Sequence, residues 1–144
     1  MKTIGSAVLL ALGMAVGGCT PPVPEGASSP IPPPARMAVL GREVALVPGQ
    51  MTNVQGEPLA IAFLRVVEDS RCPQGVQCVR AGEAKVEVML TLQDRVENGI
   101  LSTAAEPRSA SLGPYVVHLV RLDPLPTTVG PPSRYTATLR VEKP

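Results

Sequence analysis

The sequence lacks tryptophan and any excess of charge, and it has little histidine and few aromatic residues. Its 144 residues include one histidine, two tyrosines and one phenylalanine, and its formal net charge is +1. This charge excludes a nucleic-acid binder that acts by neutralising many phosphates. The chain also lacks a Gly-x-Ser-x-Gly motif, a His-Glu-x-x-His motif and a phosphate-binding glycine loop. We therefore predict a protein that is not an enzyme and that binds no metal and no cofactor.

The first 18 residues have the composition of a bacterial signal peptide. Lys2 precedes an apolar run over residues 4–16, which is shorter than the roughly 20 residues of a membrane-spanning helix. The run ends in Val-Gly-Gly-Cys at residues 16–19. This ending resembles the lipobox, in which the cysteine receives a diacylglycerol and the signal is cut just before it. An ordinary secretory signal is the alternative, but we expect Cys19 to be lipid-modified and to hold the chain on a membrane.

The charge balance and Thr20 bear on which membrane this is. Loss of residues 1–18 would lower the number of basic residues from 13 to 12, which equals the number of acidic residues. Attraction to anionic lipids is therefore no part of the expected anchoring. Thr20 replaces the aspartate that resembles an inner-membrane retention signal in enteric bacteria. We expect the chain in the cell envelope, lipid-anchored at the outer membrane and facing the periplasm or the cell surface.

Residues 19–36 are predicted to form a disordered, proline-rich tether after the lipidated cysteine. The stretch over residues 20–35 reads TPPVPEGASSPIPPPA and holds seven prolines. Proline fixes φ and has no backbone N–H group, so neither a helix nor a sheet ladder is expected there. At about 3.1 Å per residue in the polyproline conformation, the tether would span up to about 50 Å.

Four later segments have the residue pattern of β-strands. Apolar and polar residues alternate with period two in Glu83–Leu92 and Arg134–Glu142, which is typical of strands with one buried face. Leu59–Val67 and Tyr115–Leu122 are largely apolar on both faces, as expected of central strands.

Turn signals separate these segments and complete the prediction of the fold. The dipeptide Asn98-Gly99 favours a two-residue hairpin turn, because both residues tolerate positive φ. Proline and glycine clusters elsewhere leave room for strands but not for long helices. We predict that residues 37–144 form a single all-β domain, an antiparallel β-sandwich or small barrel of six or seven strands.

Cys72 and Cys78 remain as a pair if Cys19 is lipidated. Five residues separate them, including a proline and a glycine, so the chain can turn back far enough to bring the two within bridging distance. A structural disulfide is the favoured interpretation. A redox pair is an alternative, although the spacing is not Cys-x-x-Cys. A metal site is another, although His118 is the only imidazole that could complete it.

A motif of specific spacing surrounds these cysteines. Its residues are Phe63, Val66, Asp69, Ser70, Arg71, Cys72, Pro73, Val76, Cys78, Ala81, Gly82 and Val86. The motif resembles that of a family of small exported bacterial proteins, many of them lipoproteins, and the resemblance extends over most of residues 55–143. It supports the disulfide and the limits of the domain and implies no activity. Members of that family often carry an aromatic residue where this chain has Arg80.

Asp69, Arg71 and Arg80 are the candidate binding residues. They lie on a segment that proline and the expected disulfide would stiffen, and stiff loops often carry binding residues. An internal brace between Asp69 and Arg71 is an alternative of equal weight. The predicted function is that of a membrane-anchored, non-enzymatic binding or structural module whose partner would be another envelope protein. A peptidase inhibitor, or another protein-binding module that acts through loop 69–82, is the alternative, and a hydrolase is less favoured.

Overall fold

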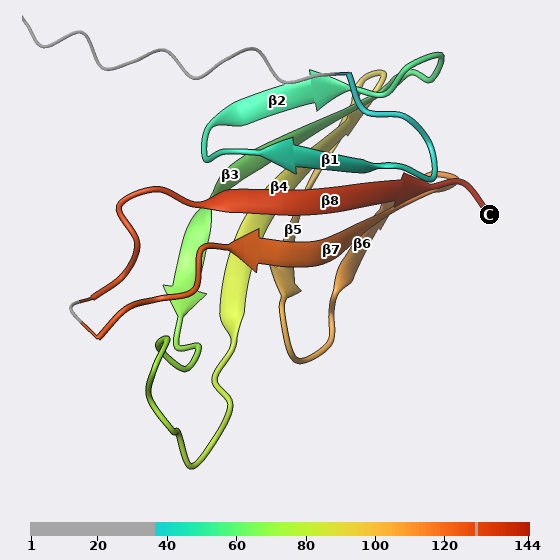
Figure 1. Ribbon diagram of the computed structural model, residues 1–144. Coiled ribbons are helices and arrows are strands. Elements are labelled where there is room, and N and C mark those ends of the chain that lie inside the picture. The colour runs from blue at the N-terminus through green and yellow to red at the C-terminus, as the bar shows by residue number, and fades with distance from the viewer. Residues whose placement is uncertain (1–36, 129) are drawn as a thin grey trace, which may run out of the picture. The chain divides into compact units, whose positions relative to one another are not determined.

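Two four-stranded antiparallel sheets pack into a sandwich in the computed structural model, which describes residues 37–128 and 130–144 (Figure 1). One sheet has the strand order β1-β8-β7-β6 and the other the order β2-β3-β4-β5. The strands are β1 Glu43–Leu46, β2 Gln50–Asn53, β3 Leu59–Asp69, β4 Ala84–Leu92, β5 Arg95–Ser102, β6 Ser109–Leu112, β7 Tyr115–Asp123 and β8 Thr136–Glu142. The prediction of an all-β domain is confirmed, and of the two predicted architectures, a sandwich or a small barrel, the structure has the sandwich.

The N-terminal predictions lie outside the described residues. They are the signal peptide of residues 1–18, the lipidated Cys19 and the tether of residues 19–36. In the part of the chain that is described, no helix is long and apolar enough to cross a membrane.

The core is built from the alternating residues that the sequence pattern marks as inward-facing. Val86 and Val88 of β4 and Leu139 and Val141 of β8 are all fully buried, and Phe63 of β3 is the largest side chain among them. Because side chains of a strand point alternately to its two faces, most of the intervening residues of β4 and β8 are partly exposed, whereas Thr138 of β8 is buried. The period-two pattern therefore decides which face of each sheet is buried.

The described residues form eight strands, where the sequence predicted six or seven. The additional short strands are β2 and β6, with the sequences QMTN and SASL. Neither has an apolar alternation that would mark a strand, and Thr52 is the one β-branched residue in the two. Each is held by its neighbour: Gln50 is the register partner of Phe63 in β3, and Ser109 is that of His118 in β7.

The predicted turn at Asn98-Gly99 is wrong. Both residues lie within β5, where Gly99 is the register partner of Val88. The chain turns instead between Leu92 and Arg95, and Gln93 takes a positive φ of 53° there. Gly99 is not a turn residue. It packs against Ala110 of β6, where there is no room for a side chain at position 99.

Strand β3 is paired on both edges over only part of its length. Strand β2 pairs with the stretch Ala60–Phe63, whereas β4 pairs with β3 along its whole length to Asp69. The register of β3 against β4 shifts twice, between Phe63 and Arg65 and between Val66 and Glu68. This bulged end of β3 leads into the cysteine loop, so the fold places the cysteine motif at one end of the sandwich.

Candidate functional site

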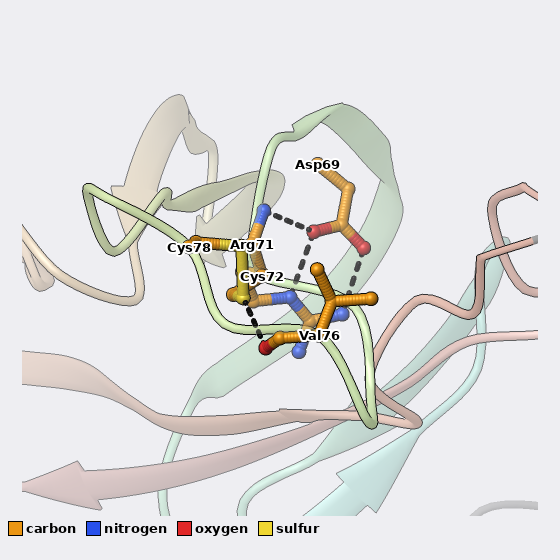
Figure 2. Close-up of a disulfide and its surroundings, with 5 residues drawn as sticks. All are labelled: Asp69, Arg71, Cys72, Val76 and Cys78. Atoms are coloured by element: carbon orange, nitrogen blue, oxygen red, sulfur yellow. Dashed lines mark hydrogen bonds and ion pairs between the residues drawn. A yellow bond between two sulfur atoms is a disulfide. The ribbon is translucent and has the colours of Figure 1, made fainter.

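The Asp69 carboxylate and the Arg71 guanidinium form a buried ion pair at the base of the loop between β3 and β4 (Figure 2). Nε of Arg71 donates to Oδ1 of Asp69 at 2.8 Å, and Nη2 donates to Oδ2 at 2.7 Å. The backbone N–H of Arg71 also donates to Oδ1 at 3.2 Å. The side chains of Arg71 and Asp69 are only 9% and 4% exposed. The pair is therefore directed into the protein and not toward a ligand in solvent.

The same two side chains join the loop to the segment between β7 and β8. Arg71 donates through Nη1 to the carbonyl oxygen of Leu122, and through Nη2 to that of Pro124 at 2.8 Å. The Tyr135 hydroxyl donates to Oδ2 of Asp69 at 3.1 Å. The ion pair thus connects the end of β3 with both ends of the β7–β8 connection, and the structure places Asp69 and Arg71 in the internal brace that was one of the two interpretations.

The brace shifts the pKa of both acidic groups in it. Burial alone would raise the pKa of Asp69, but the hydrogen bonds and the charge of Arg71 outweigh burial and hold this pKa below its usual value. Burial, together with the hydrogen bond to Asp69, raises the pKa of the Tyr135 hydroxyl. Asp69 is therefore a charged carboxylate whose oxygen atoms are both engaged by neighbouring donors.

The predicted disulfide between Cys72 and Cys78 is confirmed, with a Cα–Cα distance of 6.0 Å. The Sγ atom of Cys72 also lies 3.2 Å from the carbonyl oxygen of Val76. Figure 2 shows the two atoms facing each other. Within the described ranges, no group of three or more histidine, cysteine, aspartate or glutamate residues could hold a metal ion.

A second set of contacts closes the loop between Ser70 and Glu83. The Ser70 backbone N–H donates to the Glu83 carbonyl oxygen at 2.8 Å, and the Ser70 hydroxyl donates to the same oxygen at 3.0 Å. The neighbouring Gly82 lies so close to the backbone that an added Cβ would stand 1.6 Å from the Ser70 carbonyl oxygen. Only glycine fits there, which gives Gly82 of the motif a structural reason.

The tip of the loop is exposed, and Arg80 lies there apart from the brace. Val79 is fully exposed, and Val76 is also exposed. Arg80 is exposed and takes part in no ion pair or hydrogen bond with the described residues. The three candidate binding residues are therefore not brought together: Asp69 and Arg71 lie in the base of the loop, and Arg80 lies at its tip.

A cleft of about 540 Å³ lies between the end of β3 and the β7–β8 connection. Its walls are largely apolar, although Glu68, Asp69, Ser70 and Arg71 also line it; the apolar and aromatic side chains are Val66, Val67, Pro73, Pro126, Pro131 and Tyr135. Sequence reasoning did not predict this cleft. The prolines between β7 and β8 were visible as a loop signal, but no local pattern shows that this loop faces the end of β3.

Two other polar contacts lie away from the cysteine loop. Glu57 accepts hydrogen bonds from the Tyr115 hydroxyl and from Nζ of Lys143, the latter at 3.0 Å, and these bonds lower the pKa of Glu57. This contact ties the turn between β2 and β3 to the opposite sheet. His118 lies in β7, with Nε2 3.5 Å from a carboxylate oxygen of Glu142. Neither arrangement adds a residue to the loop or to the cleft.

No protein-family model matches the chain, and neither a curated protein nor a solved structure matches it. The resemblance to exported lipoproteins stays a prediction that rests on the motif residues between Phe63 and Val86.

Proposed function

We propose that this chain is a lipid-anchored, non-enzymatic protein-binding module of the bacterial cell envelope, and that it contacts its partner through the tip of the loop between β3 and β4. The observation that carries the proposal is the full exposure of Val79 beside the exposed Arg80 on a loop whose base is fixed. Covering an exposed apolar side chain with a partner removes it from water, and this lowers the free energy of the complex. A preformed loop also loses little conformational entropy on binding.

Two structural features support a fixed loop. The disulfide closes residues 72–78, and the Asp69–Arg71 pair ties the preceding residues to the β7–β8 connection. Their position below the tip leaves Val79 and Arg80 free to meet another molecule. Asp69 and Arg71 then act as positioning residues rather than as contact residues.

The expected location rests on the N-terminal sequence and on the disulfide. Disulfides persist in oxidising compartments such as the periplasm and the cell surface. The lipobox at residues 16–19 supplies the anchor, and Thr20 favours the outer membrane. Replacement Cys19→Ala should leave an unprocessed precursor or release the protein from the envelope fraction. A Cys19→Ala protein that matures and stays bound to the membrane contradicts the lipid anchor.

A site-specific crosslinker tests the binding surface. A photoreactive amino acid at position 79 should yield one discrete crosslinked product in intact cells, and Arg80→Ala should reduce its amount. The matched control is the same amino acid at position 96, because Val96 is also exposed, at 57%, but lies on β5. Equal products from positions 79 and 96, or no product from position 79, contradict the proposal.

An inhibitor of envelope or secreted peptidases is the second candidate. It is favoured by one observation: Val79 and Arg80 are exposed directly after a cysteine of the disulfide, as a loop offered to a peptidase active site would be. At equimolar concentration, the full chain would then inhibit a serine peptidase that cleaves after arginine. The replacement Arg80→Ala would abolish this inhibition. Rapid cleavage after Arg80 without inhibition contradicts this candidate.

A further inference from the structure

The end of β3 has a free edge. The stretch Leu64–Asp69 continues past Phe63, the last residue that pairs with β2. On the side away from β4, no described strand pairs with this stretch, and no other backbone–backbone hydrogen bond reaches it within residues 37–128 and 130–144. A strand edge without a neighbour presents N–H and C=O groups that can pair with another chain.

Both edge strands on this side of the sandwich stop before the cleft. Strand β1 ends at Leu46, opposite Ala137, and the chain then turns into β2, which begins opposite Phe63. The first residue of β8, Thr136, and the last six residues of β3 are thus left uncovered by these two strands. Figure 1 shows the lower half of β3 beside the connection that leads into β8. The cleft opens at this position, with Val66 and Val67 on one wall and Tyr135 on the other.

We propose that an extended polypeptide segment binds here as an added strand. Its backbone pairs with the free edge of Leu64–Asp69, and its apolar side chains at alternate positions enter the cleft beside Pro126 and Tyr135. Six residues of strand extend for about 20 Å, which accommodates a short peptide in one line. This mode takes its affinity from backbone hydrogen bonds and its specificity from pockets for every second side chain.

The charges of the cleft match a ligand with uncharged side chains. The two buried charges in the wall, Asp69 and Arg71, neutralise each other at 2.7 Å. The carboxylate of Glu68 is paired with Nζ of Lys85 at 3.1 Å. An unpaired charge on the ligand would lose its hydration without gaining a partner, so apolar side chains are the chemistry that fits.

The bulges in β3 select a short segment over a second copy of this chain. Two register shifts occur within the last seven residues of the strand, and bulges bend an edge and interrupt regular pairing. Two such bent edges facing each other would be out of register, whereas a flexible peptide can follow the bend. The site therefore suits a segment that becomes ordered on binding.

Selection from a random nonapeptide display library tests this inference, with the full chain in mild detergent as the target. We expect enriched peptides with apolar residues at alternate positions. Val67→Lys, which places a charge on the free edge, should weaken the binding of the selected peptides at least tenfold. The matched control Val96→Lys, at another exposed valine that lies on β5, should leave their affinity unchanged.

N-methylation of the selected peptide separates strand addition from simple apolar docking. Methyl groups on the alternate backbone nitrogen atoms that face β3 should abolish binding, whereas methyl groups on the other alternate set should not. Equal effects of the two sets, the absence of any enriched peptide, or binding that Val67→Lys leaves unchanged overturns the inference. A dimer in sedimentation that Val67→Lys dissociates also overturns it, because a second copy then occupies the edge.

The outcome is independent of the function proposed for the loop tip. Arg80→Ala should leave peptide binding at the β3 edge unchanged while reducing the crosslink from position 79. Failure of one surface therefore does not imply failure of the other.

Discussion

Gly99 of β5 and Ala110 of β6 lie so close that a Cβ atom added to Gly99 would stand 2.8 Å from the Cβ of Ala110. The two strands are edge strands of different sheets. Their close approach joins the two sheets on this side of the sandwich, and a side chain at position 99 would push them apart.

The replacement Gly99→Ala should lower the free energy of unfolding by about 1–3 kcal/mol, because the added methyl group overpacks this contact. Urea unfolding of the full chain in mild detergent would measure the change. The second replacement Ala110→Gly should restore most of the loss by removing the opposing methyl group. A Gly99→Ala variant with unchanged stability would show that β6 does not lie against Gly99.

The turn between β4 and β5 predicts a stabilising replacement. Gln93 has a φ of 53°, which costs a residue with a side chain roughly 1 kcal/mol relative to glycine. Gln93→Gly should therefore raise the free energy of unfolding by about 0.5–1 kcal/mol. Asp94→Gly is the control, because Asp94 does not have a positive φ, and it should be neutral or destabilising. If urea unfolding shows that Asp94→Gly is the more stable of the two variants, the positive φ does not lie at Gln93.

Removal of one partner of the Asp69–Arg71 pair should be costly. Arg71→Ala leaves Asp69 buried and without its cation, and we expect a loss of about 3 kcal/mol in the free energy of unfolding. The double replacement Asp69→Leu with Arg71→Met should cost less, because no charge then stays unpaired. Arg65→Ala is the control: Arg65 pairs with Glu87 but is 67% exposed, so its loss should be within about 0.5 kcal/mol.

The lowered pKa of Asp69 predicts how stability depends on pH. The folded chain binds a proton at Asp69 less readily than the unfolded chain, whose carboxyl pKa is about 3.9. The stabilisation by the brace is therefore complete above this value and is lost as the pH falls through the lower pKa of the folded state. Urea unfolding from about pH 5 to pH 2 should show a shallower loss of stability in Asp69→Asn than in the natural chain.

Glu57 and Glu83 also have lowered pKa values, through hydrogen bonds from Tyr115 and Ser102 respectively and from neighbouring lysines. Some pH dependence should therefore persist in Asp69→Asn. An Asp69→Asn variant with the full pH dependence of the natural chain would contradict the assigned role of Asp69.

Loss of the disulfide should weaken the fold without abolishing it. The ring is short, so chain entropy gives it only about 2 kcal/mol, and the paired replacement of Cys72 and Cys78 by serine should lower the free energy of unfolding by that amount. Peptide mapping after alkylation without a reducing agent should find neither Cys72 nor Cys78 alkylated in the natural chain. Reactive thiols at these positions under non-reducing conditions would contradict the disulfide.

Local sequence patterns predicted the parts of the fold in which neighbouring residues carry the signal. The alternation in Glu83–Leu92 predicted β4 and its buried face, because a strand with one buried face needs apolar residues at every second position. The short spacing of Cys72 and Cys78 predicted their disulfide for a similar reason, since five residues can bring them together with little help from the rest of the chain.

Residues distant in sequence decided the rest of the structure. Asn98-Gly99 has the local preference of a turn, but the pairing of β5 with β4 and the approach of Ala110 place it within a strand. Strands β2 and β6 have no apolar alternation of their own. They form strands because they pair with β3 and β7.

The sequence by itself determined the all-β class, the alternating core and the disulfide, because period, turn chemistry and cysteine spacing are local properties of the chain. The tertiary structure alone decided the roles of the candidate residues. Arg71 became part of a brace because Leu122 and Pro124 offer it carbonyl oxygens from more than 50 residues away. The free edge of β3 and its cleft exist because β2 stops pairing at Phe63 while the β7–β8 connection folds back beside it, and no local preference encodes that meeting.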